Sequence, residues 1–323
     1  MQGFIKRRSD FKTIALLDVI DYDITLASIY DENSSFKVAG EVALNQGDFL
    51  FFEGHGWIIE RSDPAEGMTQ ITCVDLVNLF SRSIVYTVGT DIETFIQDGI
   101  EDNFSGSGDT VFDMPYIVVT VATTTTFIAP EVKDGVYSLK SYIALARRLS
   151  GVYVSFAVAG STLSVSIEAR SAVSRKIDFL DDAHKILAES YSASSVAKIT
   201  AMELVGDTVT LVRDFYLMAD GSVTETPVGT RATGDWVAIT TTTNGDDTAV
   251  KVADDFAKNS YSHLIEFESS KVYGFYDRLQ VRIRGRVLSS YISAIRKSSK
   301  SNRTLYKSGE LRLTLTDKLK EMI

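Results

Sequence analysis

The residue types that most often carry out catalysis are few and widely spaced in this sequence. Its three histidines, His55, His184 and His263, lie far apart and in different kinds of segment. A zinc site needs closely spaced His, Cys or carboxylate ligands, and neither the HExxH motif nor the GxSxG nucleophile motif occurs. The single cysteine, Cys73, stands in an alternating stretch with no histidine nearby, which indicates a small buried side chain. We therefore predict no catalytic centre, no metal and no cofactor.

Carboxylates are abundant enough to suggest acid/base chemistry. Glu53, Glu60 or Asp75 could supply the acid/base pair of a glycosidase. Acidic residues at strand ends are more often solvated, so we favour that interpretation for these three residues.

A second acidic group lies closer to the N-terminus and could suggest a cation site. It consists of Asp18, Asp21 and Asp23. A calcium loop needs further oxygen ligands and a glycine at fixed offsets, which are missing here. We therefore interpret this group as part of a solvated strand face.

Positive charge is concentrated near the C-terminus. Segment 271–323 carries 13 Lys and Arg against 4 Asp and Glu, although the whole chain has a net charge of −10. Arg282, Arg284 and Arg286 alternate with other residues, so the period of a strand would place all three on one side. They could bind nucleic acid or contact an acidic surface of a neighbouring subunit or partner. Because neither a recognition helix nor interleaved aromatics accompanies them, we favour the subunit contact.

Short strands and tight turns predict the scaffold that would hold these residues. The apolar runs Phe49–Phe52 and Trp57–Arg61 flank Gly54-His55-Gly56, whose glycines can adopt the positive φ of a tight turn. This pattern predicts a β-hairpin, and we expect Trp57 to be largely buried in a barrel core.

The segment after this hairpin adds further elements in a definite order. Turn-forming residues fill 63–67, and Met68–Val74 follows as a strand. Asp75 is the expected N-cap of a short helix whose apolar residues share a face, and strand character resumes over 84–88.

Two longer helices are predicted in the middle of the chain. A capping box at 90–93 begins one helix, and Ser138 begins another that ends at Gly151. Strands at 152–156 and 163–167 then form a second hairpin. This part is expected to be an inserted α/β domain. Strands at 199–204 and 209–217, a threonine-rich stretch to 243 and a helix from Asp247 follow, before strands return at 264–268, 279–295 and 311–315.

Composition agrees with a folded globular protein, since 45% of the residues are hydrophobic and 24% are charged. No apolar run approaches the roughly 18 to 20 residues of a membrane helix, and the polar start lacks the apolar core of a signal peptide. We therefore expect synthesis in the cytoplasm and no membrane segment.

The order of elements between Gly47 and Val85 resembles the first domain of phage tail hub proteins. In these gp27-like baseplate hubs and siphophage tail-tip proteins, a Gly-Asp and apolar strand precedes a turn and a strand like Trp57-Ile58-Ile59-Glu60. A segment similar to Asp75-Leu-x-x-Leu-x-x-Arg82 follows. Weaker matches lie at 276–281, 291–295 and 306–311, although the family's Leu-Gly-Asp before the last strand is missing.

The resemblance implies a mainly β fold with α+β insertions: two tube-type β-barrel domains plus inserted α/β domains. We expect a first barrel over 1–88, an inserted α+β domain over 89–195, a β-rich second insertion with a helix over 196–262, and a second barrel over 263–323, completed by strands from elsewhere.

The resemblance also implies a structural protein rather than an enzyme. Such a hub adapts the sixfold tail tube or distal-tail ring of a phage tail, or of a related injection machine, to a threefold tip or spike. It would form a homotrimer with pseudo-sixfold symmetry, with Arg282, Arg284 and Arg286 at the subunit interface. Its partners would be a distal tail protein or tail tube, a tape measure protein and a spike, and DNA or effectors would pass through its channel without specific binding.

This protein would be located in the virion tail after assembly in the host cytoplasm. Two alternatives remain open at this point, a tail-tube or distal-tail ring protein and a cell-wall hydrolase.

Overall fold

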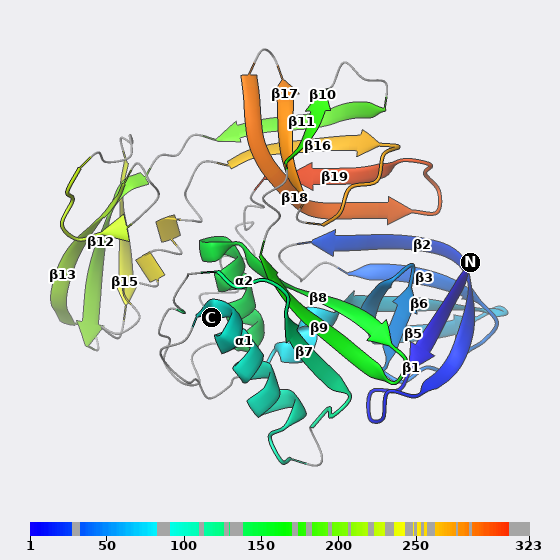
Figure 1. Cartoon of the computed structure of the whole chain (residues 1–323). Coiled ribbons are helices and arrows are strands. Elements are labelled where there is room, and N and C mark those ends of the chain that lie inside the picture. Colours follow the sequence, from blue (N-terminus) through cyan, green and yellow to red (C-terminus); the bar gives the residue numbers. More distant parts are fainter. Residues whose placement is uncertain are drawn as a thin grey trace.

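The computed structural model of the chain is mostly β, with one twelve-stranded sheet and two smaller sheets (Figure 1). The structure describes residues 1–27, 33–82, 91–109, 113–125, 129, 138–169, 174–178, 183–192, 196–205, 208–218, 223–229, 236–242, 248, 251–252, 255–256, 262–275, 277–283 and 286–309. The expected strands at 84–88 and 311–315 lie outside these residues.

The first six strands form a closed antiparallel barrel. They are β1 (Gln2–Lys6), β2 (Thr13–Ala27), β3 (Ser34–Ala39), β4 (Phe49–Phe52), β5 (His55–Ala65) and β6 (Met68–Asp75). The hydrogen-bonded order is β1-β4-β5-β6-β3-β2, and the pairing of β2 with β1 closes the circle. Closure pairs the first and last strands of the order, β1 and β2, although the long strands β2 and β5 extend beyond some of their barrel partners.

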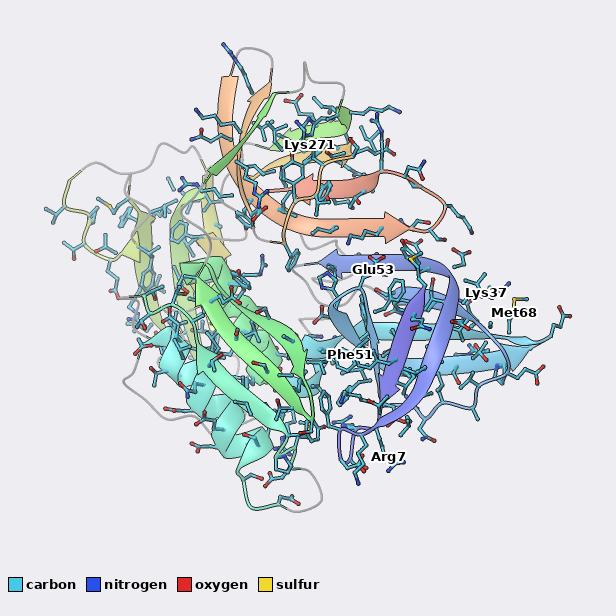
Figure 2. All side chains as sticks on the ribbon, turned by 45° about the vertical axis from the view of Figure 1, so that its right-hand side comes forward. Arg7, Lys37, Phe51, Glu53, Met68 and Lys271 are labelled. Carbon is cyan, nitrogen blue, oxygen red and sulfur yellow. The ribbon has the colours of Figure 1, made fainter. Side chains whose placement is uncertain are left out.

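Two tight turns set the register of β4, β5 and β6, and Glu53 in the first of them is labelled in Figure 2. Glu53 and Gly54 connect β4 to β5 with φ values of 49° and 79°, and Glu66 and Gly67 connect β5 to β6 with φ values of 53° and 75°. Positive φ at both turn residues is typical of two-residue hairpins. The predicted hairpin is confirmed, but the second turn is narrower than expected, because β5 continues through Pro64 to Ala65.

The barrel core is aromatic and continues into the C-terminal strands. Trp57 is fully buried, as predicted, and packs edge-on against Phe36 with ring centroids 5.1 Å apart. The same apolar cluster includes Ile265, Phe267 and other side chains of the C-terminal strands. One continuous core therefore fills both halves of the large sheet.

The C-terminal half of the large sheet repeats the strand order of the first barrel. Its strands are β10 (Ser174–Asp178), β11 (His184–Ser192), β16 (Ser262–Ser269), β17 (Arg278–Ile283), β18 (Arg286–Ser298) and β19 (Thr304–Ser308). Their order, β10-β17-β18-β19-β16-β11, follows the first barrel strand for strand. The two differ in direction at one pair, because β10 and β17 are parallel whereas β1 and β4 are antiparallel.

The pairing of β10 and β11 differs from the expected domain boundary at residue 195. β10 and β11 were expected in the inserted domain over 89–195, but they hydrogen-bond to β17 and β16. Local sequence could not reveal this, because the pairing partners are separated by the whole second insertion. In this way β10 and β11 join the C-terminal strands in one half of the large sheet.

The β-bulges of the two halves also correspond. The register of β5 shifts between Ile59 and Arg61, and that of β18 shifts between Ile292 and Ala294. Likewise, the pairing register of β2 shifts between Val19 and Asp21, and that of β11 shifts between Ile186 and Ala188. Bulges bend strands at defined positions, so their recurrence shows that the two halves share local geometry as well as strand order.

The first insertion is an α/β unit that packs on the first barrel (Figure 1). It contains α1 (Ile92–Ile100), α2 (Leu139–Ser150), β7 (Ile117–Val121), β8 (Val152–Ala159) and β9 (Thr162–Ala169), and two short helices, η1 (Leu76–Phe80) and η2 (Glu101–Ser105), accompany it. The predicted cap Ser138 accepts a hydrogen bond from the Ser141 amide, and α1 is capped by Asp91 rather than Thr90. Phe11 enters this unit from the barrel and stacks on Tyr116.

The second insertion is a four-stranded sheet of β12 (Val196–Val205), β13 (Thr208–Leu217), β14 (Val223–Thr224) and β15 (Trp236–Thr242). It has its own small core, in which Phe215 packs with Val252 and Phe256. Among the described residues, no helix is long and apolar enough to cross a membrane.

Trp57 provides a test of the barrel core. Replacing this fully buried ring with alanine should lower the free energy of unfolding by about 3 to 5 kcal/mol, because the cavity left behind would only partly collapse. Chemical denaturation of Trp57→Ala and of the matched control Leu16→Ala would measure this. Leu16 is 74% exposed, so its loss should change stability little, and an equal effect in both variants would contradict the burial of Trp57.

Candidate assembly interface

The two halves of the large sheet meet where the long strands β2 and β18 extend beyond partner strands in their own halves. β18 pairs with β17 up to Tyr291, and beyond this point β2 occupies the open side of β18. Five residues pair, from Ala294 opposite Ala27 to Ser298 opposite Asp23. We call this contact the seam (Figure 1).

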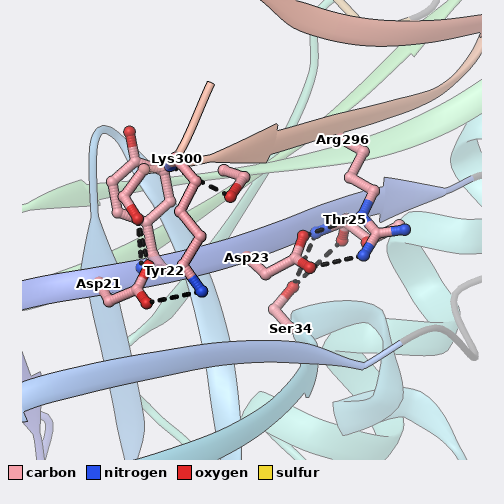
Figure 3. A network of polar contacts seen from close by, with 9 residues as sticks. Asp21, Tyr22, Asp23, Thr25, Ser34, Arg296 and Lys300 are labelled. Atoms are coloured by element: carbon pink, nitrogen blue, oxygen red, sulfur yellow. Dashed lines mark hydrogen bonds and ion pairs between the residues drawn. The ribbon is translucent and has the colours of Figure 1, made fainter. Parts of the chain in front are cut away.

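A bidentate ion pair between Arg296 and Asp23 lies on the seam (Figure 3). Arg296 donates from Nε to Oδ1 of Asp23 at 2.9 Å and from Nη2 to Oδ2 at 2.5 Å. This planar match makes the contact directional as well as charged. The hydrogen bonds from Arg296, together with its positive charge, hold the pKa of Asp23 below its usual value.

A second cluster extends the seam toward the end of β18. Lys300 lies 3.3 Å from Asp21, and the Ser299 hydroxyl donates to the same carboxylate (Figure 3). These contacts, with the Ser299 hydrogen bond as the largest cause, lower the pKa of Asp21. Lys297 lies 3.6 Å from Glu53 at the turn between β4 and β5. The acidic strand face of the first barrel therefore neutralises part of the basic C-terminal segment.

This arrangement refines two expectations. Asp21 and Asp23 were expected to lie on a solvated strand face, and both remain partly exposed while forming ion pairs; Asp18 on the same strand is exposed. The basic segment was expected to meet an acidic surface of another subunit or partner. At Arg296 and Lys300 it meets an acidic surface of its own chain.

The predicted arginine stripe does not lie along one strand, because Arg282 is on β17, which ends at Ile283, and Arg286 begins the antiparallel strand β18. Leu279 and Val281 are fully buried, and the alternate residues Arg278 and Arg282 are exposed on the other face of the strand. Arg284 lies outside the described residues, and of Arg286 only the backbone, opposite Ile283, is described. The proposed role of Arg282, Arg284 and Arg286 in a subunit interface stays a prediction.

The histidines and the cysteine considered for catalysis lie in different parts of the fold. His184 is buried, and its Nε2 lies 2.6 Å from the Tyr273 hydroxyl in the core of the C-terminal half. His55 begins β5, and His263 lies near the start of β16. Cys73 is buried, and burial raises the pKa of its thiol. Within the described residues, no three His, Cys, Asp or Glu side chains are placed to hold a metal ion.

The three candidate carboxylates also differ in their surroundings. Asp75 caps η1, accepting a hydrogen bond from the Val77 amide at 2.8 Å, and burial raises the pKa of this carboxyl to about 6. Glu53 faces Lys297 at the seam, and Glu60 is exposed on β5. Asp75 has the raised pKa of a general acid, but its carboxylate serves as a helix cap.

Comparison with known proteins places this architecture among phage tail proteins. No protein-family model and no curated protein matches the sequence. The structure is similar to prophage tail protein gp18 from Listeria monocytogenes EGD-e, with a TM-score of 0.58, 11% identity, and coverage of 100% of this chain and 98% of that chain. The tail protein from Neisseria meningitidis MC58 gives a TM-score of 0.52 at 12% identity, covering 96% of this chain and 97% of that chain.

A chain of the phage P2 baseplate, in its activated conformation with Ca, has a TM-score of 0.51 at 12% identity, covering 96% of this chain and 99% of that chain. Sequence identities this low establish a shared fold and no more. The likeness extends over nearly the whole of each chain. The expected mainly β fold with two barrel-type halves is confirmed.

The seam should give stability a specific dependence on pH. Because Asp23 has a lowered pKa in the folded protein, its ion pair should stabilise the fold above the usual carboxyl pKa of 3.8 and lose this effect as pH falls through the folded value. At neutral pH, Asp23→Asn should cost about 0.5 to 1 kcal/mol, since the pair is partly exposed.

Denaturant unfolding at several pH values would measure this difference, with Asp18→Asn as the control on the same strand. The difference between wild type and Asp23→Asn should disappear at low pH and shrink in high salt. A difference that persisted unchanged at pH 2 would contradict the ion pair.

Proposed function

We propose that this chain, which has the fold of phage tail proteins, is the structural hub of a phage tail or tail-like injection machine. The observation that carries the proposal is the repeat of one strand order, with its bulges, in two halves of a single chain joined edge to edge. A protein with two similar barrels can present twice as many similar units as it has subunits. Three copies therefore give six barrels, which matches a sixfold tube on one side and a threefold spike on the other.

Ring formation has a physical rationale in the seam. Its contact is heterologous, because the β2 side of one half meets the β18 side of the other. A head-to-tail contact that repeats either closes into a ring or continues as a filament. In a trimer the seam would alternate with a similar contact between subunits, and pseudo-sixfold symmetry would result.

Charge supports a role for the exposed arginines in this assembly. The first 270 residues carry a net charge of −19, and the remaining segment carries +9. Arg282, with Arg284 and Arg286, would meet an acidic surface of a neighbouring subunit, just as Arg296 meets Asp23 within the chain. Excess negative charge on the rest of the chain would let DNA or effectors pass through the channel without binding.

The proposed protein is non-enzymatic and resides in the virion tail. It would contact a distal tail protein or tail tube on one side, a tape measure protein in the channel, and a spike or tip protein on the other side. The alternatives are a tail-tube or distal-tail ring protein, and a cell-wall hydrolase.

Native mass measurement tests the proposed assembly directly. We expect a homotrimer, alone or with its tail partners, and ring symmetry should be visible in particle images. A hexamer would favour the tube or distal-tail ring protein, and a monomer that persists with tail partners would overturn the hub proposal. Sustained turnover of peptidoglycan by the purified protein would favour the hydrolase instead.

Neutralising the stripe tests its interface role. The triple variant Arg282→Gln, Arg284→Gln, Arg286→Gln should weaken association at physiological salt by at least tenfold, because three charged contacts would be lost at each interface. Its circular dichroism and unfolding midpoint should stay close to wild type. A control that neutralises Arg7 and Lys12, exposed near the β1–β2 turn, should assemble normally. Unchanged assembly of the triple variant would exclude the stripe from the interface.

A further inference from the structure

Within the described residues, several strands of the large sheet have an open side. One is β10, which pairs with β17 alone, and two more are β11 and β5. β11 pairs with β16 alone. β5 pairs with β6 from Trp57 to Ala65, but its pairing with β4 ends at Ile58, so Arg61–Ala65 has a paired strand on one side only. Unpaired strand edges of this kind are places where another chain can add a strand.

The internal repeat relates the open sides of β5 and β11 to the two strands of the seam. By strand order, β5 corresponds to β18 and β11 corresponds to β2. The bulges fix the alignment within each pair, since Arg61 follows its bulge as Ala294 does, and Ala188 follows its bulge as Asp21 does. Arg61–Ala65 of β5 is thus equivalent to the segment of β18 that pairs with β2 in the seam. The C-terminal part of β11 is likewise equivalent to the segment of β2 that pairs with β18.

We propose that the C-terminal part of β11 pairs antiparallel with Arg61–Ala65 of β5 in a second copy of this chain. This inference rests on the proposed hub function and specifies the contact between subunits. The seam register predicts the intermolecular one. Since Arg296 lies opposite Thr25 and Ser298 opposite Asp23 in the seam, Asp63 lies opposite Ser192 and Ala65 opposite Ser190 in the contact between copies.

The positions of these strands favour a contact between copies over one within a chain. Figure 1 shows β11 on the side of the C-terminal half that is remote from the first barrel. In the closed first barrel, two strands separate β5 from the seam strand β2 in either direction, so β5 lies across the barrel from the seam. The two open edges therefore stand at opposite ends of the chain's large sheet, as a head-to-tail contact requires.

Pro64 limits how this edge can be used. Ala65 and Met68 flank a two-residue turn, so they exchange hydrogen bonds, and the alternation of an antiparallel ladder then directs Ser62 and Pro64 to the open side. Proline supplies a carbonyl but no N–H, so the open side offers one donor at Ser62 and two acceptors. Because the edge lacks a donor at Pro64, it disfavours unspecific strand addition. It can still pair with a strand whose N–H groups lie opposite its two carbonyl acceptors.

Cysteine cross-linking tests the register. In a Cys73→Ser background, the double variant Asp63→Cys, Ser192→Cys would place two thiols opposite each other, within the Cα distances that disulfides span. Mild oxidation should then give covalent species up to the trimer on a denaturing gel. A mixture of the two single variants should give dimers only.

The seam provides a matched control within one chain. Thr25→Cys, Arg296→Cys occupies the equivalent positions of the seam and should oxidise without any increase in mass. A native trimer whose Asp63→Cys, Ser192→Cys form gives no covalent multimer would overturn this pairing and leave the hub proposal standing. A monomeric native mass in the presence of tail partners would overturn the hub proposal, and this contact with it.

Discussion

The backbone pairing between β2 and β18 is the contact on which the architecture depends. Each of these long strands pairs first within its own half and then, near its C-terminal end, with the long strand of the other half. The two barrel-type units thereby form one twelve-stranded sheet with one continuous core. The hydrogen bonds of the ladder fix the relative position of the halves, and the ion pair between Asp23 and Arg296 adds directionality at its surface. Because the ladder allows few registers, the seam defines how a second similar contact can be built.

Sequence reasoning succeeded where the structure is local. The hairpin at Gly54, the burial of Trp57 and the caps at Asp75 and Ser138 follow from turn chemistry, apolar alternation and capping preferences, all of which act over a few residues. It failed where partners are remote in sequence. Nothing near β10 or β11 indicates that they pair with β17 and β16, and no local pattern could show that Asp21 and Asp23 meet Lys300 and Arg296.

The assembly surfaces show the same limit. The alternation of Arg282, Arg284 and Arg286 suggested a single strand, but the pattern could not show that Arg282 and Arg286 lie on two antiparallel strands. Nor could it show the open edges of β5 and β11, since an edge is defined by the strands that do not cover it. These edges emerge only when the two halves are aligned by strand order and by the bulges at Arg61 and Ala294.

The placement of the insertions also controls when the protein becomes competent to assemble. The first barrel closes with contacts among residues 2–75, so it can fold while the ribosome is still translating the chain. The second half needs β17, β18 and β19, which are synthesised only after both insertions, and β2 finds its seam partner only then. An incomplete chain thus has the open edge of β5 but lacks β16, the strand on which the edge formed by β11 depends. Synthesis itself would act as a checkpoint, because a truncated product could not contact a neighbour on both sides.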